Sequence, residues 1–327
     1  MKVWYDAGTG KQVRYAVAIA RRLRSLGHEV TLTTRKHPDT LPLAEYLEEK
    51  FIVTGRYNPE SLMTRLKESI GRQRFFCKMF DQNAPDVAIS HGSVDQCRVA
   101  FGLGVPIIST VDTPYAEPVH RLTLTLSDYI VASKAIPRRI LQTYNIGGRI
   151  ESFDGVDEVA WIKGFKPKTT FDFGKPLIVV RQLEEKAVYT KDKVDLLPFA
   201  KKMTRRGKVV FLSRYTRKSI KDLIVPKGFV DSVSLIAQAD LFVGVGGTST
   251  REAALQGIPA IIVNVFPKQH VNEFLAKKGF PIFRVEPVDA LRLAGKLLGK
   301  KYDVNHLLAQ LENPVDVVAD VVKKIGT

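Results

Sequence analysis

The stretch from Leu241 to Val265, LFVGVGGTSTREAALQGIPAIIVNV, constrains the fold most, because it contains a complete strand, turn, helix and strand. A short apolar segment, Leu241 to Val243, precedes a glycine-rich turn and a helix that would end at Gly257. The segment from Ala260 to Val265 is typical of a strand buried on both faces. This unit predicts a parallel sheet covered by helices.

The turn within this stretch is a candidate anion site. Glycines let backbone amides approach a phosphate, hydroxyl side chains can cap the helix, and the positive end of the helix dipole faces the ligand. A carboxylate just inside the helix can accept hydrogen bonds from a ribose. The residues that carry this prediction are Gly246, Gly247, Thr248, Ser249, Thr250 and Glu252. Any strand, tight turn and helix also requires glycines, so a purely structural turn is the alternative.

The composition indicates a protein of about two domains. With 327 residues and 45% hydrophobic content the chain can bury a large core. No apolar run approaches the roughly 20 residues of a membrane-spanning helix, and Met1-Lys2 leads directly into a strand. We therefore expect a cytoplasmic protein. Cys77 and Cys97 lack CxxC spacing and predict neither a disulfide framework nor a zinc site.

The net charge of +16, from 50 Lys and Arg against 34 Asp and Glu, favours anionic partners. A nucleotide diphosphate, a phospholipid surface and RNA all fit, and so does a solvated basic surface without a partner. Segment 59–83 predicts a basic amphipathic helix. Such a helix can lie on an anionic membrane. The commoner arrangement, which we expect here, packs the apolar stripe on the protein's own sheet.

The chain opens with another strand, turn and helix. Lys2 to Tyr5 is a strand, a glycine turn follows, and Lys11 to Leu26 has the apolar spacing of one helical face. The turn lacks the full GxGxxG pattern, and no acidic residue ends the second strand at Glu29 to Thr33. A nicotinamide site is therefore not predicted.

Two further strands end in polar residues. Asp86 to Ser90 leads into His91-Gly92-Ser93, and Val105 to Thr110 leads into Val111-Asp112. Ligands collect at the carboxyl ends of parallel strands, so His91 and Asp112 are candidate site residues. The structural alternatives are that His91 satisfies a carbonyl and that Asp112 holds the turn before Pro114. Ser93 is suited to cap the next helix.

Several of these segments resemble the UDP-GlcNAc 2-epimerases. DVAISHGS, VPIISTVDT and AEPVHRLTLTLSDYIVAS follow the order of that family's HGD, strand-end Glu and PEExNR motifs. The resemblance implies that His91 matches the motif His, Asp112 takes the place of the Glu, and Glu117 and Arg121 match the PEExNR residues, which makes these four the candidate catalytic residues. Ser93 replaces a catalytic Asp and His120 replaces the Asn, which weakens the case for epimerisation. Glu117 and Arg121 also fit an ordinary helix pair four residues apart.

The glycine turn at Leu241 to Val265 resembles the donor-nucleotide motif of GT-B enzymes. Over nearly its full length, including GVDEVAWIKGFKP, the chain looks like a family of GT-B-like proteins found in archaea and some bacteria. The resemblance implies two Rossmann-like α/β/α domains, residues 1–165 and 176–327, with parallel sheets facing an interdomain cleft. It also implies that the last helix returns to the first domain. Cleft positions implied in this way are Gly8, Thr9, Gly10, Ser93, Arg181, Lys268, Gln269 and His270, although residues 268–270 also fit a solvated loop.

The function implied is that of a metal-independent glycosyltransferase that uses a UDP-sugar as substrate, with no other cofactor and an unidentified acceptor. One alternative is an epimerase or hydrolase of the same donor with altered acid and base groups. Another is a non-catalytic GT-B-like protein that binds RNA, the ribosome or an anionic membrane surface through its positive charge.

Overall fold

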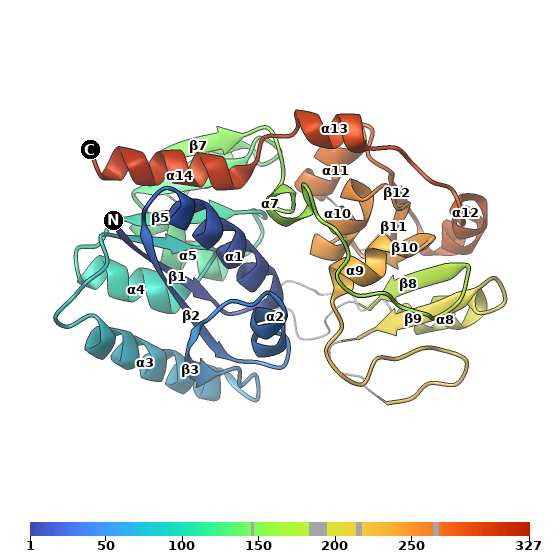
Figure 1. Ribbon diagram of the computed structural model, residues 1–327, viewed down its shortest axis with the longest axis horizontal. Coiled ribbons are helices and arrows are strands. Elements are labelled where there is room, and N and C mark those ends of the chain that lie inside the picture. Colours follow the sequence, from blue (N-terminus) through green and yellow to red (C-terminus); the bar gives the residue numbers. More distant parts are fainter. Residues whose placement is uncertain (145–146, 183–194, 214–217, 264–267) are drawn as a thin grey trace. The chain divides into compact units, whose positions relative to one another are not determined.

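The computed structural model describes residues 1–144, 147–182, 195–213, 218–263 and 268–327 (Figure 1). It divides into two compact units. The first contains Met1–Trp161 and Glu312–Thr327, and the second contains Ile162–Leu311. No helix in the described residues is both long and apolar enough to cross a bilayer.

The first unit is built on a parallel sheet of seven strands. Its order is β3-β2-β1-β4-β5-β6-β7, so the chain first builds outward from β1 on one side and then continues from β4 on the other. The strands are β1 (Lys2–Ala7), β2 (Glu29–Lys36), β3 (Ile52–Arg56), β4 (Val87–Ser90), β5 (Ile107–Val111), β6 (Tyr129–Ser133) and β7 (Arg149–Phe153). Asp6 pairs with Ser90, and Ser90 pairs with Ser109, so the loops after these strands begin at one level.

Helices cover both faces of this sheet. Side chains alternate along β1: Val3, Tyr5 and Ala7 join a core with α1 and α14, whereas Trp4 joins one with Phe76 and Phe80. Figure 1 shows α14, the last helix, alongside α1. The helices are α1 (Gly10–Ser25), α2 (Thr40–Tyr46), α3 (Leu62–Met79), α4 (Val94–Gly102), α5 (Glu117–Thr123), α6 (Arg138–Gln142), α7 (Val159–Ile162) and α14 (Pro314–Ile325), with a 3-10 turn, η1, at Leu124–Leu126.

Helix α3 corrects one expectation. We expected its apolar stripe on the sheet, but its two buried residues are Arg72 and Phe76. Arg72 donates to both carboxylate oxygens of Asp6, at 2.6 and 2.7 Å, and to Asp95 at 2.7 Å. Because a buried guanidinium needs these partners, the ion pairs set the rotation of the helix and leave several apolar side chains on its outer face.

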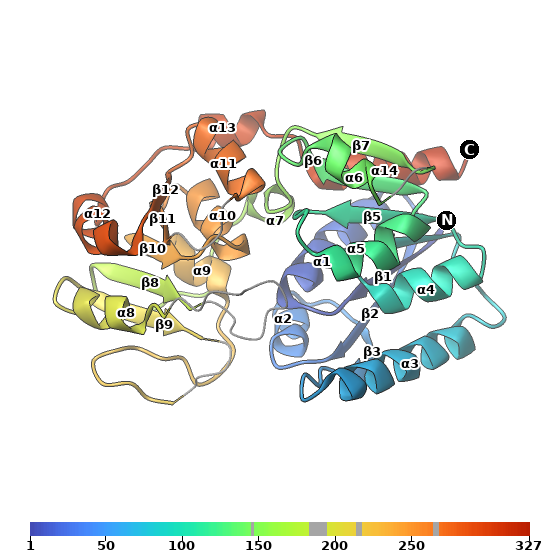
Figure 2. The ribbon, with the colours of Figure 1, turned by 180° about the vertical axis from the view of Figure 1, so that it is seen from behind.

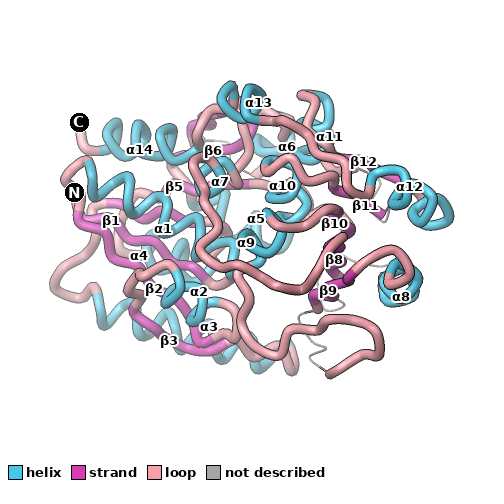
Figure 3. Tube along the Cα trace, turned by 45° about the vertical axis from the view of Figure 1, so that its right-hand side comes forward, coloured by secondary structure: helices cyan, strands magenta, loops and turns pink. Residues whose placement is uncertain are grey.

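The second unit contains a parallel sheet of five strands in the order β12-β11-β10-β8-β9. The strands are β8 (Leu177–Arg181), β9 (Lys208–Leu212), β10 (Leu241–Gly244), β11 (Ala260–Val263) and β12 (Ile282–Val285). The helices are α8 (Leu197–Met203), α9 (Ser232–Ala237), α10 (Thr248–Leu255), α11 (His270–Lys277), α12 (Ala290–Leu297) and α13 (Asn305–Gln310), with a 3-10 turn, η2, at Pro287–Asp289. Figure 3 shows the loop between α7 and β8, which contains residues 166–175 between the two expected domains.

The predicted strand, turn and helix at Leu241 are confirmed as β10, a glycine turn and α10. The next strand, β11, is described to Val263, and the last two residues of its predicted span lie outside the described residues. Strand β8 has β9 on one side and β10 on the other, so the order in which strands are added to this sheet reverses between β8 and β10. The glycine turn follows one of the two strands that flank this switch point.

Candidate functional site

In the first unit, the strand order reverses between β1 and β4, and ligands of open parallel sheets collect at such a switch point. The loop after β1 contains Gly8 and Thr9, and α1 begins at Gly10. Thr9 caps α1 by accepting a hydrogen bond from the Gln12 amide. The Gly8 amide donates to Gln12 Oε1 at 2.7 Å, and Gln12 Nε2 donates to the His91 carbonyl at 2.5 Å. These bonds tie the β1 loop to the β4 loop.

Four charged or titratable side chains meet beside these loops. Lys11 Nζ lies 2.5 Å from Asp112 Oδ2 and 2.8 Å from Asp157 Oδ2. His91 Nε2 lies 3.5 Å from Asp112 Oδ1, and His91 Nδ1 lies 3.9 Å from Asp157 Oδ2. We call Lys11, His91, Asp112 and Asp157 the lysine cluster. One ammonium between two carboxylates offsets part of the cost of desolvating them, and Asp112 keeps 20% of its side chain exposed.

The ring of His91 is held from two sides. Its Nδ1 is 2.7 Å from Thr110 Oγ1 on β5, which leaves Nε2 on the Asp112 side. Tyr15 of α1 packs its ring edge-on to His91 with centroids 5.8 Å apart. Burial raises the pKa of Tyr15 well above its ordinary value, and the charge of Asp157 raises it further. The Tyr15 phenol therefore stays neutral, and its ring packs against the imidazole of His91.

Sequence reasoning selected His91 and Asp112 but missed Lys11 and Asp157. The sequence predicts Lys11 only as the start of a helix, and Asp157 lies within the GVDEVAW segment after β7. Both follow strand ends, which was the available signal. Their meeting depends on the order of strands in the sheet, because 146 positions separate them in the chain.

His91, Asp112 and Asp157 are also ligand types that metals use. Their ligand atoms lie within 4.8 Å of one another. Lys11 already contacts both carboxylates, so the chain itself supplies a cation where a metal would bind.

Ser93 has a structural position. It caps α4 by accepting from the Gln96 amide, as predicted, and its hydroxyl donates to Asp6 Oδ2 at 2.6 Å. Ser93 therefore belongs to the buried Asp6 and Arg72 network rather than to the lysine cluster.

Glu117 and Arg121 lie on α5 and form an ion pair of 2.6 Å, with 57% and 70% of their side chains exposed. The structure does not bring this pair into the lysine cluster. His120, between them in sequence, is buried, and its Nε2 donates to the Thr113 carbonyl at 2.7 Å. Burial lowers the pKa of His120 below its ordinary value of 6.5, although this hydrogen bond opposes the shift.

In the second unit, the β10 to α10 turn has the geometry of a close backbone approach. Gly246 has φ +91°, and a Cβ there would lie 1.8 Å from Gln269 Oε1. The following Gly247 is the N-cap of α10 and is exposed. The prediction that a hydroxyl caps this helix is wrong, because α10 has no side-chain cap. Ser249 and Thr250 are buried in its first turn, beside the half-buried Thr248.

Glu252 is 2% exposed and lies in the middle of α10. Gln269 lies next to the glycine turn, because its Nε2 donates to the Val245 carbonyl at 3.0 Å and its Oε1 accepts from Asn272 at 2.6 Å. His270 begins α11, and burial followed by the charge of Lys268 lowers the pKa of its ring. Lys268 is exposed, and Arg181 is the half-buried last residue of β8.

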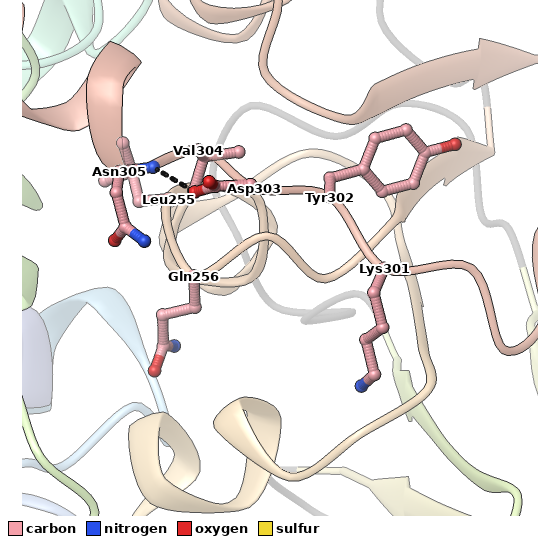
Figure 4. A pocket seen from close by; sticks show the side chains of 7 residues that line it. All are labelled: Leu255, Gln256, Lys301, Tyr302, Asp303, Val304 and Asn305. Atoms are coloured by element: carbon pink, nitrogen blue, oxygen red, sulfur yellow. Dashed lines mark hydrogen bonds between the residues drawn. The ribbon is translucent and has the colours of Figure 1, made fainter.

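The second unit also contains a hollow that lies away from the glycine turn. It is lined by Leu255, Gln256, Lys301, Tyr302, Asp303, Val304 and Asn305 (Figure 4). The backbone amide of Asn305 donates to the carboxylate of Asp303 at 3.0 Å. This hollow adjoins the carboxyl end of α10, whereas the glycine turn precedes the amino end, so the two are separate features.

Comparison with known proteins adds to this geometry. Residues 1–326 match the model of a family described as protein of unknown function DUF354. The chain belongs to the DUF354 family. A relative from Methanocaldococcus jannaschii, the uncharacterized protein MJ0665, is 30% identical over 339 residues, which is 97% of this chain and 96% of the relative.

Solved structures show that this DUF354 protein has the GT-B fold. The UDP-GlcNAc 2-epimerase of Methanocaldococcus jannaschii, in complex with UDP-GlcNAc and UDP, matches with a TM-score of 0.73 at 16% identity, over 99% of this chain and 100% of that one. The MnaA–UDP structure from S. aureus matches at 0.71 and 13% identity, over 99% and 96%. The kitacinnamycin glycotransferase matches at 0.62 and 14% identity, over 99% and 98%. The expected fold class is confirmed.

Proposed function

We propose that this protein is a nucleotide-sugar-dependent enzyme, a metal-independent glycosyltransferase that uses a UDP-sugar. The observation that carries the proposal is the lysine cluster at the switch point of the first sheet, where a histidine and two carboxylates surround one ammonium. Charged groups held together at this position are typical of acid and base catalysis.

The nucleotide would bind at the β10 to α10 turn. The first backbone amides of α10 have no side-chain cap, and the N-cap residue Gly247 is exposed. An uncapped helix start with a glycine turn suits a diphosphate. Glu252 would accept hydrogen bonds from the ribose. Two proteins of similar structure, the UDP-GlcNAc 2-epimerase of Methanocaldococcus jannaschii and MnaA of S. aureus, were solved with UDP bound, which supports UDP as the diphosphate.

In the reaction, the acceptor hydroxyl forms a bond to the anomeric carbon while the bond from that carbon to the diphosphate oxygen breaks. Asp112, with His91 at 3.5 Å, would accept the acceptor's proton. The leaving UDP carries the charge of the broken bond, which backbone amides and the cationic groups of Arg181 and Lys268 would stabilise, with the neutral His270 imidazole as a further hydrogen-bond donor. Gly8, Thr9 and Gly10 would line the acceptor side, with Glu117 and Arg121 as exposed acceptor contacts.

A second candidate is an epimerase or hydrolase of the same UDP-sugar. The structural match to the UDP-GlcNAc 2-epimerase of Methanocaldococcus jannaschii at a TM-score of 0.73 favours it. In this case Asp112 and His91 would act on the sugar or on water instead of on an acceptor.

Calorimetry with UDP, UDP-GlcNAc, GDP and ADP at low and high salt tests the proposal. We expect saturable binding that prefers UDP, persists at high salt and weakens about tenfold or more in Glu252→Ala. Incubation with UDP-GlcNAc and NMR of the products then separates hydrolysis and epimerisation from transfer. If no nucleotide binds and RNA is captured in a salt-sensitive manner instead, the protein is a non-catalytic member of the fold.

A further inference from the structure

The outer face of α3 carries an unusual set of side chains. The helix is anchored at its amino end by a capping box of Ser61 and Thr64, and its inner face is Arg72 and Phe76. In Figures 1 and 2 it lies at the edge of the first unit beside β3 and α4. Its opposite face is therefore free to meet solvent or a partner.

That outer face is apolar. Leu62, Leu66 and Ile70 follow one another every fourth residue and are 81%, 53% and 56% exposed. Met63 lies beside this row, three residues before Leu66, and is 58% exposed. Residues four apart form one stripe on a helix, so these four side chains make a continuous strip. We call it the α3 strip. Ile52 and Val53 on the neighbouring strand β3 are also exposed.

Basic side chains border the strip. Lys67, Arg74 and Lys78 are exposed, and helical spacing places them along one side of the apolar residues. The one acidic residue of α3, Glu68, is paired with Arg56 at 2.7 Å. The face therefore combines apolar groups with uncompensated positive charge.

The positive charge beside the α3 strip indicates which kind of partner binds there. A second copy of the chain would bring identical basic borders together, which is unfavourable at short range. A nucleic acid would pair with the lysines and arginines but would leave the apolar strip in water. A bilayer with anionic headgroups satisfies both, because leucine, isoleucine and methionine enter the acyl boundary while the ammonium and guanidinium groups meet phosphates.

We propose that the α3 strip and its basic border dock the first unit onto an anionic membrane surface. Flotation with phosphatidylcholine vesicles containing about one third phosphatidylglycerol tests this, with pure phosphatidylcholine vesicles as the neutral comparison. We expect binding to anionic vesicles to be at least about tenfold stronger and to weaken at high salt.

Two sets of variants separate the apolar and basic contributions. Leu66→Glu with Ile70→Glu should abolish binding, because two carboxylates would enter the acyl boundary. The triple variant Lys67→Gln, Arg74→Gln and Lys78→Gln should weaken binding on the order of a hundredfold, since each basic group contributes roughly fivefold. The matched controls lie in the second unit: Val288→Glu, at a residue 89% exposed, and Lys201→Gln, Lys202→Gln and Lys300→Gln. Both controls should bind like wild type.

Three outcomes would overturn the proposal. Equal binding to neutral and anionic vesicles would remove the role of charge. Absence of vesicle binding by a protein that light scattering shows to be a dimer, and that Leu66→Glu with Ile70→Glu converts to a monomer, would assign the strip to a second copy. RNA binding lost in the triple variant, with no vesicle binding, would assign it to nucleic acid. The substitutions lie on the surface, and thermal unfolding of each variant checks that it is folded. Vesicle and UDP binding are separate measurements, so either can fail alone.

Discussion

The ammonium of Lys11 lies 2.8 Å from the carboxylate of Asp157, and this carboxylate is 2% exposed. The two residues come from opposite ends of the first unit's main segment, one after β1 and the other after β7. The same ammonium also contacts Asp112, so Lys11 bridges the two carboxylates of the lysine cluster.

A double-mutant cycle tests that relationship. Lys11→Met should lower the free energy of unfolding by about 3 kcal/mol, because it leaves two neighbouring carboxylates without their cation. Asp157→Asn should also destabilise the protein. The double variant should lose less than the sum of the two, with a coupling energy of at least about 1 kcal/mol. Urea unfolding measures all three, and strictly additive losses would show that the two side chains do not interact.

Asp112 and Glu117 distinguish a cluster carboxylate from an exposed one. Asp112→Asn should abolish turnover of a UDP-sugar while UDP affinity stays within about twofold, because the amide cannot accept the proton. Glu117→Gln should change stability by only a few tenths of a kcal/mol, since its pair with Arg121 is exposed. If Glu117 contacts the acceptor, KM for the acceptor should rise with little change in kcat. Full activity of Asp112→Asn would remove Asp112 from the mechanism.

The backbone of Gly246 should tolerate no side chain. Gly246→Ala places a methyl group at φ +91° and against Gln269, so we expect a loss of about 1 to 2 kcal/mol in the free energy of unfolding. Gly247→Ala is the matched control, because a Cβ there meets nothing within 4 Å and its φ is −117°. It should stay within about 0.5 kcal/mol of wild type in urea unfolding. Equal losses in both variants would contradict the role of the positive φ.

His120 should make stability depend on pH. Its pKa is lowered in the folded protein by burial, so the unfolded chain binds more protons in the window below 6.5. The free energy of unfolding therefore falls as pH drops through 6.5 toward the lowered folded-state pKa, and this loss is absent above 6.5. His120→Gln keeps an amide donor for the Thr113 carbonyl and should flatten this dependence.

Urea unfolding at about pH 7.5 and about pH 5.5 measures the effect, because these values bracket the ordinary histidine pKa. The exposed His306→Gln variant controls for the substitution itself and should keep the wild-type slope. An unchanged slope in His120→Gln would assign the pH dependence to other groups.

Local features of the protein follow from its sequence alone. Alternating apolar and amphipathic segments predicted a parallel sheet covered by helices, the resemblance to GT-B enzymes implied two such sheets, and the glycine turn at Gly246 was placed correctly between β10 and α10. Ser93 was recognised as the cap of α4, and the pairing of Glu117 with Arg121 was foreseen as an alternative. These features depend on periodicity, capping and residues four apart, which operate over a few positions of the chain.

Only the tertiary structure decided which distant charges meet. Arg72 sits in a helix whose apolar residues suggested the opposite rotation, and its position depends on Asp6, 66 residues away. Lys11 and Asp157 likewise carry no local sign of each other. A buried charge is stable only where an opposite charge lies beside it, and the order of strands in the sheet determines which charged residues are neighbours. The same requirement turned the apolar strip of α3 outward, so the membrane-facing surface that we propose is a consequence of a buried ion pair.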